Sequence, residues 1–464
     1  ANMEEFMDKI ELLKSRRAAL LDCGREIREK IASLTDEKSF VELDAYSFSR
    51  NDFYGEDAQG EGVITGFATI DGMPVYIVAQ NVKVLSGGVS RANCLKIRKC
   101  LDKALQTEYP VVYLFDSLGV QVGEGVNVLE GIADVISASC ELKGVVPQFS
   151  IVTGKLYGSL ALLAAGADYN FMLKESRVAY ASPLVISAAS GKNLSDETVA
   201  GIKASEKNSL TTFVADNMSD VRTTISDILT GYSLPVEDSS EDDFNRVSPG
   251  LNEKVCPKCL IKAVFDNGKL LYRNKEFWSE IVSRIGRTGG MSVAEIIFDG
   301  GEKGVELTVA GVSKLKSFTE FAVRNGLPLV TFVNTLGIKA DLETSNSTIM
   351  KDVYALAELL RSANRLSVVY GKAVGLGYTL FAAKSLGVDY SYAFANAEIG
   401  LFDGAATAAA FGEVREDKLA EFEKRYSDKN ADPINAAKNG YIDNIIEPQF
   451  VRAYVISALQ TIVR

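Results

Sequence analysis

A strand-to-helix turn near residue 158 could offer backbone N–H groups to a substrate oxygen. An apolar run ends at Gly154, the residues KLYGS follow, and the apolar segments LALLAAGA and 169–173 come next. This order predicts a strand, a glycine turn, a buried helix and a second strand. The first N–H groups of a helix have no intrahelical acceptor and lie at the positive end of its dipole. Gly158 and Ser159 are therefore candidates for binding an oxyanion, although a turn used only for packing is the simpler interpretation of this segment alone.

The same pattern occurs a second time further along the chain. Three blocks recur in the same order at a nearly constant offset of about 220 positions, which indicates a duplicated domain and not a solenoid of short repeats. The repetition favours a functional role for the turn. The matched blocks are Gly154-Lys155 with Gly371-Lys372, Asp168-Tyr169 with Asp389-Tyr390, and PVVYLFDSLGVQ from Pro110 with PLVTFVNTLGIK from Pro328.

The elements that position these turns are predicted to alternate between strands and helices, which is typical of the α/β class. The 464 residues suggest an N-terminal domain over 1–240 and a C-terminal domain over 260–464. Residues 235–258 are rich in Asp, Ser, Pro and Gly and are predicted to be a linker. Asp71-Gly72 separates two β-rich runs and predicts a hairpin, and residues 4–34 predict an amphipathic helix.

Composition excludes several kinds of chemistry. The net charge of −11 argues against nucleic acid as the main partner, because phosphate binding needs a basic face. No apolar run approaches the ~20 residues of a membrane span, and we expect a cytoplasmic protein. The chain has no histidine, which excludes Ser-His-Asp catalysis and histidine-ligated metals, so no metal site is expected. Cys256-Pro257-Lys258-Cys259 is either a redox pair or a simple turn, and we favour the turn.

Five segments in order carry a more specific signal: GVITGFATIDGMPVYIVAQNVKVLSGGVS, DSLGVQVGEGV, GVVPQFSIVTGKLYGS, GKAVGLGYTLFAAKSLGVDYSYAFANAEIG and AKNGYIDNIIEP. Together they resemble the biotin-dependent acyl-CoA carboxyltransferases, which are the β-type subunits of propionyl-CoA and acetyl-CoA carboxylases. Glutaconyl-CoA and methylmalonyl-CoA decarboxylases use close relatives. The resemblance implies two tandem crotonase-like domains of stacked β-β-α superhelical turns. It also implies a homodimer or a homohexamer (a trimer of dimers), with each active site between the N-terminal domain of one subunit and the C-terminal domain of its partner.

The chemistry that this resemblance implies needs no protein base. Carboxybiotin loses CO2, and the ureido nitrogen left behind removes the α-proton of the acyl-CoA. Gly158 and Ser159 would hold the thioester oxygen, and Leu376 and Gly377 the ureido oxygen of biotin, all through backbone N–H groups. The residues assigned to binding of coenzyme A or biotin are Gly87, Gly88, Lys96, Gly119 and Gly375. For Lys96 a solvated helix face is the commoner explanation.

The chain departs from the family pattern at several loop positions. The family's DSGGARxxEG loop occurs as DSLGVQVGEG, with Leu118 in place of a glycine and Gln121 in place of the arginine, and Leu376 stands at a second glycine position. Leucine narrows the approach to the backbone. Three functions therefore stay open: an active carboxyltransferase or ligase subunit of fatty-acid metabolism, a decarboxylase component that runs the reaction from acyl-CoA to biotin, or a catalytically silent scaffold. The chain contains no Ala-Met-Lys-Met motif, so biotin is expected on a separate carrier protein, with a biotin carboxylase subunit as a further partner.

Overall fold

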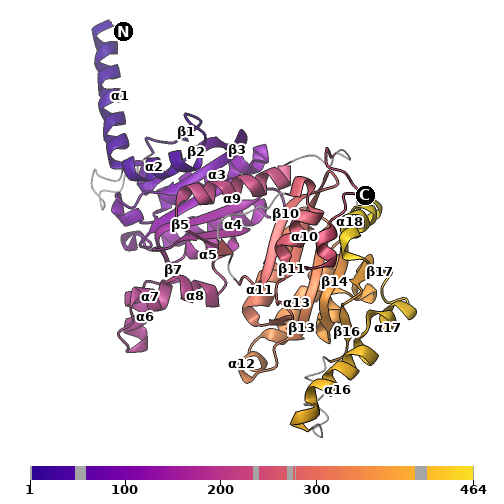
Figure 1. Ribbon diagram of the computed structural model, residues 1–464. Helices are drawn as coiled ribbons and strands as arrows, with labels where there is room; N and C mark the ends of the chain where they lie inside the picture. The colour runs from indigo at the N-terminus through magenta and orange to yellow at the C-terminus, as the bar shows by residue number, and fades with distance from the viewer. Residues whose placement is uncertain are drawn as a thin grey trace. The chain divides into compact units, whose positions relative to one another are not determined.

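The computed structural model describes residues 3–47, 59–233, 240–268, 275–276, 278–402 and 415–462. The chain divides into two compact units, Ala1–Ser226 with Arg273–Phe277, and Asp227–Tyr272 with Trp278–Arg464. Each unit is an α/β structure in which an antiparallel hairpin continues into parallel strands covered by helices (Figure 1).

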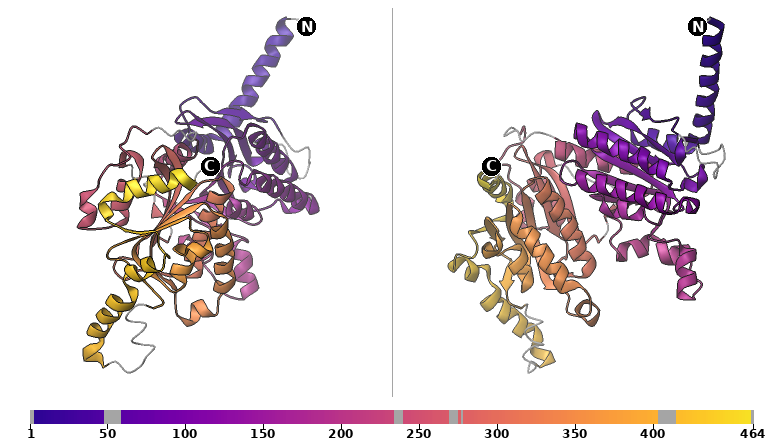
Figure 2. Two further views of the ribbon diagram at one scale, coloured as in Figure 1. Left: turned by 90° about the vertical axis from the view of Figure 1, so that its right-hand side faces the viewer. Right: turned by 180° about the vertical axis from the view of Figure 1, so that it is seen from behind.

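The sheet of the first unit has the order β1-β2-β3-β4-β5-β6-β8-β9, and β7 pairs with the end of β5. Helices α3 and α4 lie side by side on one face of this sheet (Figure 2), where they cover the buried strand β4. The strands are β1 (Val41–Leu43), β2 (Val63–Ile70), β3 (Met73–Gln80), β4 (Val111–Ser117), β5 (Gln148–Tyr157), β6 (Tyr169–Leu173), β7 (Arg177–Ala179), β8 (Phe213–Ala215) and β9 (Lys275–Glu276). The helices are α1 (Met3–Cys23), α2 (Arg25–Leu34), α3 (Arg91–Thr107), α4 (Val126–Leu142), α5 (Ala161–Gly166), α6 (Pro183–Ser190), α7 (Asp196–Ala200), α8 (Ile202–Lys207) and α9 (Met218–Ser233).

The sheet of the second unit repeats this order as β10-β11-β13-β14-β15-β17, with β12 beside β13 and β16 beside β14. Helices α10 and α18 pack on one side of it and share a core with β11, β13 and β14. The strands are β10 (Ile281–Thr288), β11 (Met291–Phe298), β12 (Val305–Leu307), β13 (Leu329–Ile338), β14 (Arg365–Val374), β15 (Tyr390–Phe394), β16 (Glu398–Gly400) and β17 (Asn444–Ile446). The helices are α10 (Pro257–Val264), α11 (Val309–Arg324), α12 (Leu342–Ser345), α13 (Ile349–Ser362), α14 (Leu376–Phe381), α16 (Leu419–Tyr426), α17 (Pro433–Lys438) and α18 (Val451–Ile462).

Local sequence explains the two hairpins. Asp71 and Gly72, with φ of 48° and 78°, join β2 to β3, and Gly289 and Gly290, with φ of 59° and 81°, join β10 to β11. Two consecutive positive φ angles give a turn whose twist matches that of the strands, so residues that tolerate them are required. The predicted hairpin at Asp71-Gly72 is confirmed.

Two local expectations were wrong. Strand β5 does not stop at Gly154 but continues to Tyr157, because its last residues pair with β7. The predicted linker is, over its described residues 240–258, a packed part of the second unit. Leu251 is buried there, and the Arg246 guanidinium donates hydrogen bonds to Asp242 and to the carbonyl oxygen of Phe265. The charged residues and prolines therefore indicated a segment of irregular structure, but this segment packs within the second unit and is not a linker.

Candidate functional site

The first candidate turn lies where β4 and β5 of the first unit end. Gly119 follows β4 with φ of 128°, and Gly158 follows β5 with φ of 91°. A Cβ atom at Gly158 would lie 3.7 Å from the Cα of Gly119, so the two glycines face each other. Residues with side chains rarely adopt such φ angles, which explains why glycine stands at both positions.

The amides of this turn differ from the predicted pair. The Gly158 N–H donates a hydrogen bond to the carbonyl oxygen of Ala179 at 3.1 Å, so it is occupied within the protein. Among the described residues, the N–H groups of Ser159 and Leu160 have no acceptor, and Leu160 precedes α5 without a side-chain cap. The structure thus corrects the assignment of Gly158: the strand ladder extends one residue further, and the unpaired amides lie one position later.

The second candidate turn repeats this arrangement after β14. The Gly375 N–H donates to the carbonyl oxygen of Gly400 at 3.0 Å, and Leu376 and Gly377 then begin α14. The N–H groups of these first two helical residues have no intrahelical acceptor. Gly337, with φ of 85°, lies against them, because a Cβ atom there would be 3.2 Å from the Gly377 nitrogen and 3.5 Å from the Leu376 nitrogen. The predicted amides of Leu376 and Gly377 therefore border a space that Gly337 keeps open.

The same hydrogen bonds hold both turns. A side-chain oxygen at the end of the neighbouring strand accepts the N–H of a lysine in each, Asp116 Oδ1 from Lys155 at 3.1 Å and Asn334 Oδ1 from Lys372 at 3.0 Å. A hydroxyl two residues before the facing glycine also accepts that glycine's N–H in each turn. Burial raises the pKa of the Asp116 carboxyl group. The side-chain amide of Asn334 accepts the equivalent hydrogen bond without carrying a charge. The duplication thus includes the side chains whose hydrogen bonds hold each turn.

Gly87 and Gly88 pack against the first turn. A Cβ atom at Gly87 would lie 2.2 Å from the carbonyl oxygen of Asp116, and one at Gly88 would lie 1.9 Å from Nε2 of Gln121. Gln121 occupies this space by donating a hydrogen bond to the carbonyl oxygen of Leu85 at 3.1 Å. The two glycines are therefore needed for the close approach of two loops, and their predicted place along the coenzyme A path stays a prediction.

Lys96 is not at the surface. Its side chain is buried, and Nζ donates hydrogen bonds to the carbonyl oxygens of Gly60 at 3.1 Å and Val63 at 2.5 Å. Burial lowers the pKa of Lys96 to about 8. Lys314 of α11 makes the matching bonds in the second unit, to the carbonyl oxygens of Trp278 and Ile281. Phosphate binding by Lys96 would require two internal hydrogen bonds to break, and the repeated pattern indicates that this lysine fastens a helix to the hairpin.

A pocket of about 580 Å³ opens at the second turn. Its walls are mainly apolar, and Leu376, half-exposed, lies on the wall beside its own amide. Sequence reasoning missed the lining residues in and after α17. The segment AKNGYIDNIIEP was noticed, but nothing in it gave a role to single side chains. The lining residues are Gly375, Leu376, Tyr378, Thr379, Ile399, Gly400, Leu401, Phe402, Asn435, Ala436, Asn439 and Tyr441.

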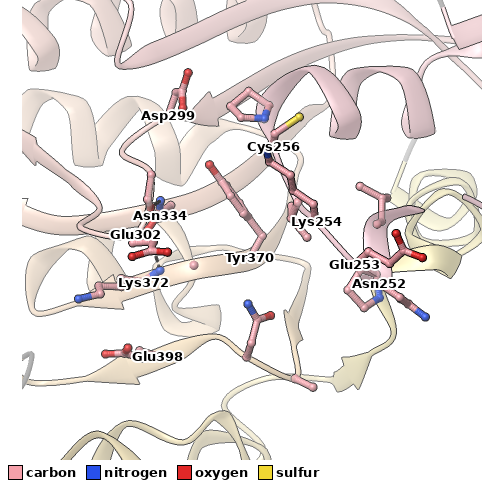
Figure 3. A pocket seen from close by; sticks show the side chains of 18 of the residues that line it. Asn252, Glu253, Lys254, Cys256, Asp299, Glu302, Asn334, Tyr370, Lys372 and Glu398 are labelled. Atoms are coloured by element: carbon pink, nitrogen blue, oxygen red, sulfur yellow. Dashed lines mark hydrogen bonds between the residues drawn. The ribbon is translucent and has the colours of Figure 1, made fainter. Parts of the chain in front are cut away.

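A second cavity of the same unit, of about 860 Å³, lies at the carboxyl ends of β11, β13 and β14 (Figure 3). Asn334 and Lys372 border it beside Tyr370, whose hydroxyl donates to the carbonyl oxygen of Phe298. Burial raises the pKa of Tyr370 and of Asp299 at the edge of the cavity. Asn334 and Lys372, whose hydrogen bond holds the second turn, therefore also line this cavity.

Within the described ranges, no three His, Cys, Asp or Glu side chains are grouped so that they could hold a metal ion. In the same ranges, no helix has both the length and the apolar character to cross a membrane.

The chain was compared with known proteins. The family model "Carboxyl transferase domain" matches residues 22–464. Methylmalonyl-CoA decarboxylase subunit alpha of Veillonella parvula is 30% identical, with 98% of this chain and 96% of that protein aligned. Propionyl-CoA carboxylase beta chain of Roseobacter denitrificans is 28% identical over 98% of this chain and 96% of its own length.

Solved structures agree on the fold. Transcarboxylase 12S, in a crystal structure with hydrolysed methylmalonyl-CoA bound, superposes with a TM-score of 0.86 at 24% identity, covering 99% of this chain and 96% of that one. The predicted fold class of two tandem crotonase-like domains is confirmed. Family model, relatives and fold agree with the two matched turns: this chain belongs to the carboxyl transferase domain family, as the resemblance predicted.

Proposed function

We propose that this protein transfers a carboxyl group between carboxybiotin and the α-carbon of a short acyl-CoA. The observation that carries the proposal is the pair of matching turns, each with main-chain amides that have no acceptor among the described residues and that lie beside a glycine. A thioester enolate carries negative charge on its oxygen, and the ureido oxygen of biotin would take up negative charge as CO2 leaves. Preorganised backbone donors stabilise such charge by roughly 3 kcal/mol each.

In this proposal the two turns have separate tasks. The Ser159 and Leu160 amides hold the thioester oxygen of the acyl-CoA, and the Leu376 and Gly377 amides hold the ureido oxygen of biotin. The pocket of about 580 Å³ at the second turn supports this division, because its apolar walls and terminal donors suit a small ring with one polar carbonyl. When bound, carboxybiotin supplies the CO2 and the base, which agrees with a chain that has no histidine.

The proposed partners follow from the same chemistry. Biotin arrives on a separate carrier protein that a biotin carboxylase subunit loads, and the chain works in the cytoplasm as a homodimer or homohexamer. Transcarboxylase 12S is itself a hexamer assembly in a crystal structure that superposes on this chain with a TM-score of 0.84. The most informative alternative is a decarboxylase component, because a relative at 30% identity is named methylmalonyl-CoA decarboxylase subunit alpha.

The half-reaction tests the proposal with the purified full chain. Malonyl-CoA or methylmalonyl-CoA is mixed with biocytin, and acetyl-CoA or propionyl-CoA is measured by chromatography. We expect biocytin-dependent decarboxylation of at least one of the two. If neither turns over while calorimetry detects coenzyme A binding, transfer to biotin is refuted. If calorimetry also detects no binding of coenzyme A, the catalytically silent scaffold is the function that the result supports.

A further inference from the structure

The Cys256-Pro257-Lys258-Cys259 segment is not the simple turn that the sequence favoured. The structure joins Cys256 and Cys259 by a disulfide. Cys256 is the N-cap residue of α10, and its sulfur accepts a hydrogen bond from the Cys259 N–H at 3.2 Å. The two sulfurs therefore lie at the positive end of a helix, where an anionic thiolate is stabilised.

Cys256 borders a cavity through which a small molecule can approach it. Cys256 and Pro257 line the 860 Å³ cavity described above, whereas Cys259 is not among the lining residues (Figure 3). Both cysteines are half-buried, neither enclosed in the core nor fully exposed. A small thiol that enters the cavity thus reaches Cys256 first.

The remainder of α10 is anchored without the disulfide. Leu260 and Ile261 are buried in the core of the second unit. Nη1 of Arg452 donates a hydrogen bond to the carbonyl oxygen of Val264 at 2.6 Å, and Arg246 donates to that of Lys262 at 3.0 Å. Opening the disulfide therefore frees only the first turn of the helix and the adjoining cavity wall, so reduction does not require the unit to unfold.

We propose that the Cys256–Cys259 disulfide is a thiol–disulfide exchange site whose reaction partner is a dithiol. A thiolate of the dithiol attacks the Cys256 sulfur, the bond between the two cysteines breaks, and Cys259 leaves as a thiolate that takes up a proton. The second thiol of the partner then attacks its own sulfur in the mixed disulfide and releases Cys256. The partner is oxidised to a disulfide by two electrons, and the two cysteines become thiols. In a reducing compartment such a bond is transient, as disulfides of cytosolic proteins usually are.

The first experiment uses the wild-type chain. It is treated with dithiothreitol under native conditions, denatured in acid, alkylated and analysed by mass spectrometry, while Trp278 fluorescence reports whether the second unit stays folded. Without reductant we expect labels on Cys23, Cys94, Cys100 and Cys140, which the structure leaves free, and none on the pair. With dithiothreitol we expect both paired cysteines to be labelled and the fluorescence to be unchanged. Free Cys256 and Cys259 in air-equilibrated protein, or reduction only after unfolding, would overturn the proposal.

The second experiment uses the variant Cys259→Ser, which leaves the N–H that stabilises Cys256. Exposed Cys140 serves as the control thiol in the same molecule. The positive end of α10 and the Cys259 N–H favour the thiolate form of Cys256, so at about pH 6.5 more of this thiol is ionised than of a thiol without such donors, and this gain outweighs the lower nucleophilicity of the stabilised thiolate. We therefore expect iodoacetamide to alkylate Cys256 about fivefold faster than Cys140 at that pH. Equal rates would show that the helix does not activate this sulfur and would overturn the proposal.

Discussion

Replacing Gly337 by alanine tests the second turn most directly, because it fills the space beside the amides without removing any side chain. The new Cβ atom would lie 3.2 Å from the Gly377 nitrogen and 3.5 Å from the Leu376 nitrogen. An oxygen held by those amides needs to be about 2.7–3.1 Å from each of them. The methyl group and the substrate oxygen therefore compete for the same space.

The expected loss follows from the two donors. Removal of one oxyanion donor lowers kcat by about 10²–10³-fold, and Gly337→Ala obstructs two. We expect biocytin-dependent decarboxylation of malonyl-CoA to fall at least about 10²-fold, mainly in kcat, because the acyl-CoA is assigned to the other turn. Alanine at a φ of 85° also costs roughly 1–2 kcal/mol of stability.

The variant Gly326→Ala controls for that strain. Gly326 lies in the same unit with φ of 65°, and a Cβ atom there would meet nothing within 4 Å. Both variants should therefore lose stability from backbone strain in urea unfolding followed by Trp278 fluorescence, and Gly337→Ala should lose somewhat more because its Cβ atom lies 3.2 Å from the Gly377 nitrogen. Only Gly337→Ala should lose activity. If Gly337→Ala turns over within about threefold of the control, less than one donor contributes, and the amides of α14 do not bind the reacting oxygen.

Three further predictions concern buried ionisable groups. Glu295 is fully buried with no hydrogen-bond partner among the described residues, and burial raises its pKa from 4.5 to about 8. The folded state thus keeps a proton that the unfolded chain releases, so stability relative to Glu295→Gln should fall with rising pH across that window, by up to about 1.4 kcal/mol per pH unit; parallel urea midpoints from pH 5 to 8 would contradict this. Arg452→Met should cost about 3–5 kcal/mol in the same assay, because the buried guanidinium bonds two carbonyl oxygens and a carboxylate; a loss below about 1 kcal/mol would refute it. Lys96→Met should lower stability and leave KM for acyl-CoA unchanged, whereas a several-fold rise in KM that depends on salt would favour the phosphate role.

The fold was predicted well because the residues that form strands and turns recur in both halves of the sequence. Positions 71–72 are an Asp-Gly pair between alternating runs, which is a strong signal for a hairpin, and β2 and β3 form that hairpin. The assignment of the site residues stays a prediction, but the structure shows which of the chosen amides are paired. Gly158 was chosen for its glycine, but whether an amide is free depends on its pairing with Ala179, 21 residues away, which no local pattern reveals. The burial of Lys96 was not predicted for a similar reason. Its charge suggested an exposed side chain, but the two carbonyl oxygens that accept its hydrogen bonds belong to residues more than 30 positions earlier.

The donors of both turns are main-chain groups, and this has a consequence for how the protein can be dissected. Alanine scanning changes side chains, so Ser159→Ala or Leu376→Ala leaves each N–H in place and would score these positions as dispensable. Replacing a single peptide bond by an ester, which deletes the proton and keeps the side chain, is the appropriate chemical probe. Loss of a side chain at these turns is for the same reason a poor indicator of whether the protein still works, whereas a side chain added at a facing glycine, as in Gly337→Ala, obstructs the amides.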